Sequence, residues 1–232
     1  MTLGDWVNVV TVCYNAENSI ERTINSVHSQ TYSNINYILV DGASSDKTME
    51  VVEKCRHRID SVISEVDRGI YDAMNKGLNI SKPGWVVFMN AGDEFSDPDV
   101  ISEVIEHLER LPDVSLVYGD KLVNGEVVQA WPLNYLKKGI IMACHQSMFF
   151  KVCDLRYDTS MKIYSDYDFV CQYLSKNHTR PSYFPRVMSN YEGGGVSSFI
   201  TFQKRLDKYR AVFRHFGCIG LIRAFAYKIS EV

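Results

Sequence analysis

The segment VNVVTVC, residues 7–13, decides the fold. Its β-branched residues predict a buried strand, and residues 17–30 follow it with Ile20, Ile24 and Val27 at helical spacing. Further strands are predicted at 37–40, 59–66, 85–89 and 115–118. Because helical segments separate these strands, we expect an α/β fold in which a mostly parallel, Rossmann-like sheet is flanked by helices.

Helix and turn signals support this alternation. Asp97-Pro98 opens a helix, with proline near its first position. Another helix is predicted over 69–80. The dipeptide Asn124-Gly125 predicts a hairpin within residues 121–130. Residues 131–139 are expected to form a flexible region over a binding site.

Composition excludes several classes of protein. The 232 residues are 46% apolar and 23% charged, which is typical of folded domains and not of disordered or fibrous chains. The net charge is −3 and the pI is near 6.1, so nucleic acid is not an expected partner. The six cysteines form no C-x-x-C pair, and no segment approaches the length of a membrane span. The N-terminus has an acid at Asp5 and no basic region, unlike a signal peptide. These features predict a cytoplasmic protein with reduced thiols.

The predicted strands end in acids and amides. The four loops after them contain Tyr14–Glu17, Asp41–Asp46, Glu65–Gly69 and Asn90–Glu94. Parallel strands place such loops at one edge, where converging carboxylates repel one another unless a cation joins them. Oxygen ligands suit Mg²⁺ or Mn²⁺, and such a site suits a phosphorylated ligand. A G-x-G-x-x-G fingerprint and a Walker A loop are absent, which disfavours dehydrogenases and P-loop NTPases.

Five blocks carry a family resemblance. They are VVTVCYNAE (9–17), VDGASSDKT (40–48), SEVDRGIYDAMNKGL (64–78), VVFMNAGDEF (86–95) and YSDYDF (164–169). Together they resemble the inverting, family-2 bacterial glycosyltransferases of GT-A fold, above all the enzymes that build O-antigen or exopolysaccharide repeat units on a lipid carrier. The resemblance covers about residues 7–195. It implies a catalytic domain over 1–196, with a nucleotide-sugar half to about residue 120 and an acceptor half over about 121–196.

The resemblance implies a hexosyltransferase that uses a nucleoside diphosphate sugar, with UDP as the expected nucleotide. Asp41 matches the acid that accepts a hydrogen bond from the base, because a carboxylate can select a base edge that shows an N–H group. Tyr14 and Glu17 match the pair that contacts base and ribose, and Asp67 matches an acid near them.

Asn75, Lys76 and His145 are further candidates for donor binding. Lys76 can point at the diphosphate or remain a solvated surface charge. His145 can touch the phosphates or acceptor, or serve only as a structural histidine.

Asp93 and Asp166 match the family's metal-binding acid and its catalytic base. Asp166 would accept the proton of the acceptor hydroxyl, while metal held by Asp93 stabilises the leaving diphosphate. Asp168 is a rival base, and both acids also fit a purely structural role at a helix N-terminus. Gly92 stands where many members carry a second Asp, so Asp93 would share its metal with water and phosphate oxygens.

The acceptor is expected to be a saccharide, lipid-linked by analogy with the family. The tail, residues 197–232, repeats apolar residues at spacings of three and four: Phe199, Phe202, Leu206, Tyr209, Phe213 and Phe216, then Ile222, Phe225 and Ile229 after Gly217. From residue 203 to 232 the local charge is +5, from seven Lys/Arg and two Asp/Glu. This helical stripe can pack on the catalytic domain, lie on an anionic membrane through 199–232, or pair with another subunit.

Two rival functions are a nucleotidyltransferase and an inactive nucleotide-sugar-binding protein. A nucleotidyltransferase needs a glycine-rich basic loop near the first strand, and residues 14–20 contain neither glycine nor a basic side chain. The oligomeric state, the donor sugar and the linkage stay open. A peripheral position at the inner face of the cell membrane accompanies the membrane interpretation of the tail.

Overall fold

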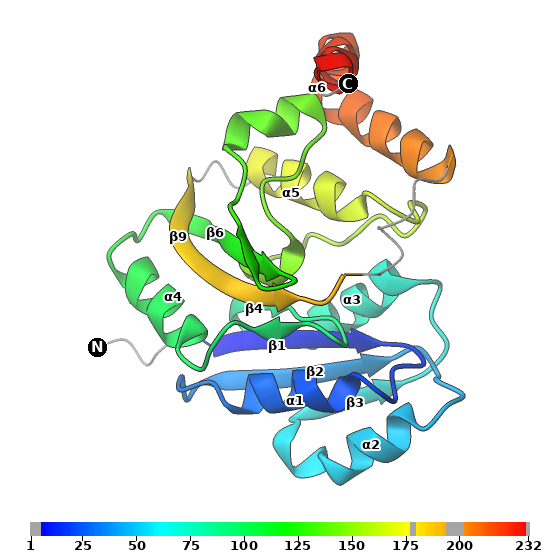
Figure 1. Cartoon of the computed structure of the whole chain (residues 1–232), viewed down its shortest axis with the longest axis vertical. Coiled ribbons are helices and arrows are strands. Elements are labelled where there is room, and N and C mark those ends of the chain that lie inside the picture. The colour runs from blue at the N-terminus through cyan, green and yellow to red at the C-terminus, as the bar shows by residue number, and fades with distance from the viewer. Residues whose placement is uncertain (1–5, 177–179, 194–201, 231–232) are drawn as a thin grey trace.

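A computed structural model describes residues 6–176, 180–193 and 202–230, whose arrangement Figure 1 shows. The strands are β1 (Trp6–Cys13), β2 (Ile35–Asp41), β3 (Ser61–Ser64), β4 (Gly84–Phe88), β5 (Glu94–Phe95), β6 (Val114–Val123), β7 (Glu126–Val128), β8 (Met148–Lys151) and β9 (Arg180–Tyr191). The α-helices are α1 (Ile20–His28), α2 (Thr48–Lys54), α3 (Ile70–Asn79), α4 (Val100–Glu109), α5 (Ser165–Lys176) and α6 (Phe202–Ser230). Three short 3-10 helices are η1 (Arg56–Arg58), η2 (Leu133–Lys138) and η3 (His145–Ser147).

The strands form one sheet in the order β3-β2-β1-β4-β8-β6-β9-β5, with β7 paired to β6. The first four neighbours are parallel, as the alternation predicts. β8 runs antiparallel to both β4 and β6, while β6 and β9 are parallel. The α/β prediction is confirmed, and the second half of the sheet is mixed. β6 is longer than the predicted strand because three partners, β7, β8 and β9, extend its ladder.

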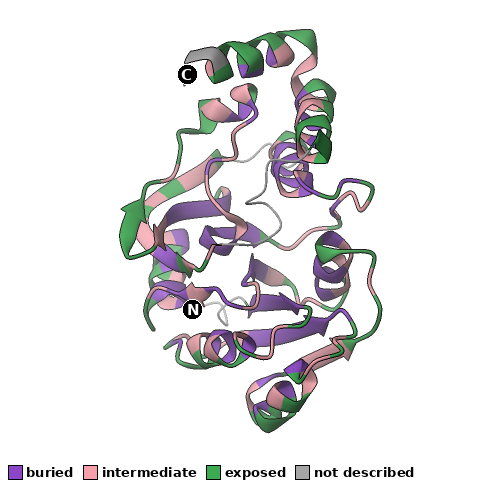
Figure 2. Cartoon of the chain, turned by 45° about the vertical axis from the view of Figure 1, so that its right-hand side comes forward, coloured by how far each residue is buried: buried purple, intermediate pink, exposed green. Residues whose placement is uncertain are grey.

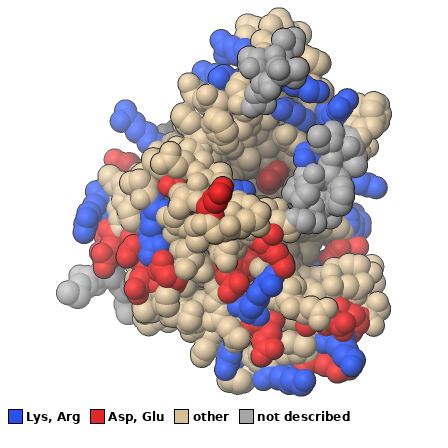
Figure 3. Space-filling model, viewed as in Figure 1, with Lys and Arg blue, Asp and Glu red and all other residues tan. Residues whose placement is uncertain are grey.

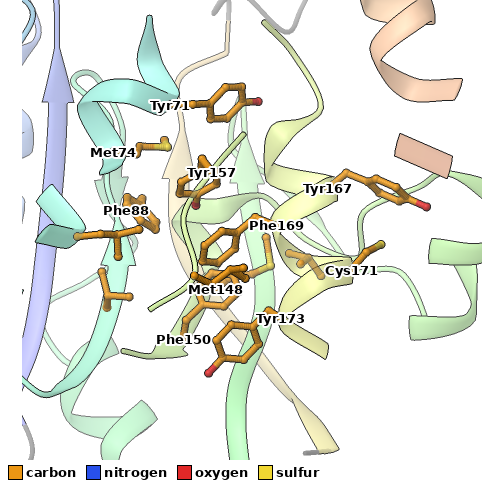
Figure 4. Packing of buried hydrophobic residues seen from close by; sticks show 14 of the residues in the cluster. Tyr71, Met74, Phe88, Met148, Phe150, Tyr157, Tyr167, Phe169, Cys171 and Tyr173 are labelled. Atoms are coloured by element: carbon orange, nitrogen blue, oxygen red, sulfur yellow. The ribbon is translucent and has the colours of Figure 1, made fainter. Parts of the chain in front are cut away.

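Two apolar layers cover the sheet, and β1 supplies both. Val10 and Val12 face the layer that contains α3, α5 and α6, whereas Val7 and Val9 face the layer that contains α1, α2 and α4. This alternation is the two-residue period of a strand buried on both faces. Figure 2 shows buried residues along the central strands and on the inner sides of the helices. In the first layer, aromatic rings pack in series, and Phe169 stacks on Tyr157 with ring centroids 4.3 Å apart (Figure 4).

The hairpin prediction is confirmed, because Val123 pairs with Glu126 across Asn124 and Gly125, which both have positive φ. The segment predicted to be flexible, residues 131–139, instead forms η2 and packs against α6. There Trp131 stacks on Tyr135, and the Tyr135 ring meets Tyr227 of α6 edge to face.

The tail forms α6, which is broken at Gly217 as the pattern predicts (φ 59°). The predicted stripe is not the face that packs on the domain. Ala211, Val212 and Ala224 are buried, whereas Phe202, Leu206 and Phe213 are 76%, 48% and 53% exposed. Small side chains let the helix approach closely, so the larger ones turn outward, and only Tyr209 and Phe216 of the described stripe pack partly on the core. Phe199 lies outside the described residues, and no helix within them is long and apolar enough to cross a bilayer.

The contact between α3 and β1 gives a test of the core. A Cβ at Gly77 would overlap the side chain of Val10. We predict that Gly77→Ala lowers the free energy of unfolding by about 1–3 kcal/mol, because the helix must shift away from the sheet. Urea denaturation measures this loss. The double variant Gly77→Ala/Val10→Ala removes the overlap, so the two losses should be strongly non-additive, and simple additivity would contradict this packing.

Candidate active site

The loops after β1 and β2 are tied together at the carboxyl edge of the sheet. The Asn15 backbone N–H donates to Ser44 Oγ over 2.8 Å, and the Asn15 side-chain oxygen accepts from the Ser45 N–H over 2.9 Å. Glu17 Oε2 accepts the Lys47 N–H over 2.9 Å. Glu17, which is predicted to bind the donor, therefore also holds the loop after β2 in place through this hydrogen bond.

Asp41 lies beneath this loop and is fully buried. Its carboxylate accepts hydrogen bonds from the Ser44 N–H (3.1 Å), the Ser44 hydroxyl and the Ser64 hydroxyl (2.7 Å). These donors come from the protein, so Asp41 holds the loop after β2 against β3. It lines neither of the two pockets described below.

Tyr14 and Asp67 flank the backbone of Gly42. A Cβ at Gly42 would lie 3.4 Å from Tyr14 Cδ2 and 2.5 Å from Asp67 Oδ2, so glycine leaves room for both side chains. Tyr14 is 64% exposed, and its ring is available to a planar ligand. The structure thus brings together two of the residues predicted to contact base and ribose.

Asn75 and Lys76 lie on α3 but do not line either pocket. The Asn75 amide donates to Tyr157 O over 3.0 Å and accepts the Tyr157 N–H over 2.8 Å, so both of its ends hold the chain before α5. Lys76 Nζ lies 2.9 Å from Val66 O and 3.0 Å from Glu65 Oε1. The polar atoms of both residues thus have protein partners, and their contact with the donor stays a prediction.

Asp93 lies in a pocket of about 150 Å³ beyond β4. Its Oδ1 accepts the Glu192 N–H over 3.0 Å, and its Oδ2 accepts the Gln146 side-chain amide. Burial raises the pKa of Asp93 to about 6, because these bonds and the charge of Lys121 offset only part of the lost hydration. The structure therefore holds a carboxylate that is short of positive charge.

Two amide oxygens near Asp93 are buried without a hydrogen-bond partner. They are Asn90 Oδ1 and Gln146 Oε1, and both residues line the Asp93 pocket. A carboxylate with two unpaired amide oxygens is an all-oxygen donor set, which fits Mg²⁺ or Mn²⁺ better than a softer metal. Within the described residues, no group of three or more His, Cys, Asp or Glu side chains is arranged for a metal, so amides and ligand oxygens would complete the coordination.

His145 contacts this group through its ring. Its Nε2 lies 2.8 Å from the side-chain nitrogen of Asn90. Burial lowers the pKa of His145, although the charge of Asp166 acts in the opposite direction. A neutral ring can accept the Asn90 N–H, which turns the Asn90 oxygen away from the histidine. This assignment follows from the hydrogen-bond pattern.

Gly92 explains the departure from the usual two-acid pattern. Its φ is 101°, and a Cβ there would overlap the carboxylate of Glu192. Glu192 forms an ion pair with Arg22, whose Nε also donates to Gly92 O over 3.0 Å. The space of a second aspartate is therefore filled by a glutamate from the end of β9, which sequence spacing could not reveal.

Asp166 lies in the first turn of α5 and lines both the Asp93 pocket and an adjoining pocket of about 390 Å³. The Tyr71 hydroxyl lies 3.4 Å from Asp166 Oδ1. Burial and the Asp166 charge raise the pKa of Tyr71, so the phenol stays a neutral donor. The rival base, Asp168, is fully buried, is bound by Arg214 and His215, and lines neither pocket.

The structure thus places Asp93, His145 and Asp166 around one pocket, and Tyr14 and Asp67 around Gly42. Sequence reasoning missed Gln146, Glu192, Tyr71 and Lys121 as residues lining these pockets. Gln146 directly follows the candidate His145, and Tyr71 lies inside the GIYDAMNKG block. Their position next to predicted site residues is the signal in the sequence that could have identified them.

Comparison with known proteins identifies the family. The model of glycosyl transferase family 2 matches residues 8–229. An uncharacterized glycosyltransferase from Mycobacterium tuberculosis (strain CDC 1551 / Oshkosh) is 31% identical over 181 residues, which cover 73% of this chain and 69% of that protein. A PGL/p-HBAD biosynthesis glycosyltransferase from Mycobacterium bovis (strain BCG / Pasteur 1173P2) is 28% identical over 203 residues, which cover 79% of this chain and 77% of that protein.

Solved structures show the same GT-A fold. Staphylococcus aureus TarS 1–349 in complex with UDP-GlcNAc superposes with a TM-score of 0.76 at 17% identity, covering 96% of this chain and 73% of that one. The mannosyltransferase PcManGT from Pyrobaculum calidifontis, in complex with GDP-Man and Mn²⁺, gives 0.66 at 17% identity, covering 97% and 74%. The match spans only 37% of a longer TarS chain. The chain, matched over almost its whole length, belongs to glycosyl transferase family 2 and is a glycosyltransferase.

Proposed function

We propose that this glycosyltransferase moves a sugar, with inversion, from a nucleoside diphosphate donor, UDP-linked in the first instance, to a saccharide acceptor in surface polysaccharide assembly. The observation that carries the proposal is that Asp93 and Asp166 line the same pocket. The UDP, UDP-GlcNAc and GDP-Man complexes of structural neighbours support a nucleotide-sugar donor. Tyr14 and Asp67, on either side of Gly42, would receive the base and ribose.

One proton transfer and one leaving group define the mechanism. Asp166 accepts the proton of the acceptor hydroxyl as that oxygen attacks the anomeric carbon from the face opposite the diphosphate. The Tyr71 hydroxyl orients the Asp166 carboxylate during this step. Asp93, with the amide oxygens of Asn90 and Gln146, would hold Mg²⁺ or Mn²⁺, which when bound neutralises negative charge on the leaving diphosphate. A single displacement of this kind inverts the anomeric centre and needs no covalent nucleophile.

The larger pocket fits the acceptor. It opens from Asp166 towards η2 and α6, and most of its wall is apolar, including Trp131, Ile140 and Met142. Among the described residues that line it are three lysines, Lys121, Lys204 and Lys208, and one acid, Asp166. An acceptor with an apolar part and an anionic linker, such as a lipid-linked saccharide, complements these walls. We place the acceptor half at about residues 121–196 of a 1–196 catalytic domain, with the tail closing one side.

The outer face of α6 fits an anionic membrane surface. Phe202 and Phe213 are exposed before the break at Gly217, as are Arg205 and Arg210, and Ile222 and Arg223 are exposed after it. Asp207, the one acid of residues 202–230, is buried, so the outer face of this segment is cationic and apolar. In Figure 3, Lys and Arg side chains gather at the upper end, where α6 lies. Such a surface attracts anionic headgroups and inserts apolar side chains.

The function is tested by a donor screen and one substitution. Thermal shifts with UDP-, GDP- and dTDP-sugars plus Mn²⁺ should identify a donor that raises the melting temperature. With that donor, Asp166→Asn should lower the rate of nucleoside diphosphate release at least about 100-fold, with water or sugar as acceptor, while the donor-induced shift is kept. Exposed Asp113→Asn is the matched control. Full turnover by Asp166→Asn removes the base assignment, and donor binding without any wild-type turnover would favour an inactive binding protein.

Asp93 gives a pH-dependent prediction. Its pKa of about 6 lies above its ordinary value, so the folded chain binds this proton more tightly than the unfolded chain. Without a cation, the stability from this group is present below about pH 4 and is lost as the pH rises through about 6. Asp93→Asn should therefore unfold with up to about 3 kcal/mol more free energy at pH 7.5 than wild type, and with little gain at pH 4. Urea denaturation in a chelator measures both, and parallel pH profiles would contradict the assignment.

Membrane contact is tested with vesicles. The wild type should sediment with phosphatidylcholine vesicles that contain phosphatidylglycerol and much less with phosphatidylcholine alone, because headgroup charge supplies part of the binding. Phe213→Ser/Ile222→Ser should weaken the binding about tenfold or more, since two apolar side chains no longer enter the lipid. Val66→Ser, at a residue 81% exposed outside α6, is the control. Equal sedimentation of all three proteins would refute a lipid-binding face.

A further inference from the structure

The chain that carries Asp166 has no helix or strand between Lys151 and Ser165. Just before α5, Tyr164 has a φ of 71°, an unfavourable conformation for a residue with a side chain. Such a segment keeps one conformation only if contacts from elsewhere over-determine it. Those contacts come in large part from α6, more than 35 residues further along the chain.

Asp207 of α6 fixes the segment on the N-terminal side of the base. This carboxylate is 1% exposed, and its Oδ2 accepts the Lys162 N–H over 3.0 Å and the Ile163 N–H over 3.1 Å. Gln203 donates to the other oxygen over 2.7 Å. Lys162 and Ile163 line the Asp93 pocket, so an α6 side chain holds the backbone of the active-site wall.

Arg214 and His215 fix the segment on the C-terminal side. Asp168, two residues after the base, has no exposed surface, and its carboxylate meets Arg214 Nη1 at 3.0 Å and His215 Nε2 at 2.7 Å. Arg214 also bridges to Asp158 Oδ2 over 3.0 Å. Burial alone would raise the pKa of Asp168, but hydrogen bonds from His215 and Gln172 and the Arg214 charge lower it. The buried Asp168 carboxylate therefore depends on Arg214 and His215 of α6 for the stabilisation of its charge.

We infer that α6 is a positioning element of the active site: Arg214 and His215, through Asp168, and Asp207, through the backbone of residues 162–163, hold Asp166 where it can accept the acceptor's proton. The inference rests on the proposed role of Asp166. The contacts of Asp207 with residues 162–163 and of Arg214 with Asp168 lie within four residues of Asp166, one on each side. Together they define the position and direction of the first turn of α5. The same helix supplies Lys204 and Lys208 to the acceptor pocket, so the base and one acceptor wall share a single support.

A matched pair of arginines allows the inference to be tested. Arg214 bridges Asp158 and Asp168, and Arg186, on β9, bridges Asp97 and Glu103 with a side chain 14% exposed. We expect Arg214→Gln to lower kcat about 10- to 100-fold, because a misplacement of about 1 Å costs that much in rate. The affinity for the donor nucleotide should stay within about twofold, and Arg186→Gln should keep the wild-type kcat. Rates are measured well below the melting temperature of each variant, by nucleoside diphosphate release.

A second variant separates positioning from folding. Asp168→Asn/Arg214→Gln leaves no unpaired buried charge, so it should be more stable than Arg214→Gln and still slow. The inference is overturned if Arg214→Gln loses no more kcat than Arg186→Gln, if the double variant turns over at the wild-type rate, or if donor affinity falls in parallel with kcat. Asp166→Asn distinguishes a failure of the base assignment from a failure of the role of α6. If Asp166→Asn stays active, the base assignment fails. If Asp166→Asn is inactive and Arg214→Gln has the wild-type kcat, only the role of α6 is overturned.

Discussion

The site depends on β1, which is hydrogen-bonded along both edges. It pairs in parallel with β2 down to Cys13 and Asp41, and with β4 up to Val10 and Phe88. A strand with partners on both sides and apolar layers on both faces cannot slip in register without exposing every second side chain. The ends of the three strands are therefore fixed relative to one another. That constraint brings the β1 and β2 loops together, and it also fixes the end of β4, which Asn90 and Asp93 follow.

Three buried carboxylates show how differently the same charge can be stabilised. Asp41 is satisfied by hydroxyls and a backbone N–H, and Asp168 by a guanidinium and an imidazole. Asp93 receives only one backbone N–H and one amide N–H, and burial raises its pKa to about 6. Both oxygens of each of the first two carboxylates accept hydrogen bonds from the protein, and the contact of Asp41 with the base stays a prediction. An incompletely compensated carboxylate in a pocket is instead typical of a functional site, and here it lies beside two unpaired amide oxygens.

The sequence predicted the parallel strands and the hairpin well because their signals are local. β-branched runs predicted the strands and Asn124-Gly125 predicted the hairpin. Asp93 and Asp166 were indicated by the family resemblance, and their roles stay predictions. It predicted less where a role depends on distant partners. The hydrogen bond from Asn75 to Tyr157, 82 positions away, has no signal in the sequence, and the donor contact of Asn75 stays a prediction. Glu192 reaches Gly92 across 100 positions, and no spacing rule connects them. The tail was periodic in sequence, yet short residues such as Ala211, which the pattern ignored, form its packing face.

The local signals come from the loops at the strand ends, and the distant ones come from the segments around the larger pocket. The loops that we propose for donor binding begin directly at the ends of adjacent strands, so residues that are close in sequence form them. The larger pocket, which we propose for the acceptor, is lined by residues on either side of η2, by the first turn of α5 and by α6, segments that meet only after the chain has folded. Its geometry is set by pairs such as Asp168 with His215, which contribute nothing until both helices are in place. Changes in α6 can therefore alter the larger pocket and the segment before α5 without replacing any side chain that lines the Asp93 pocket among the described parts of the chain.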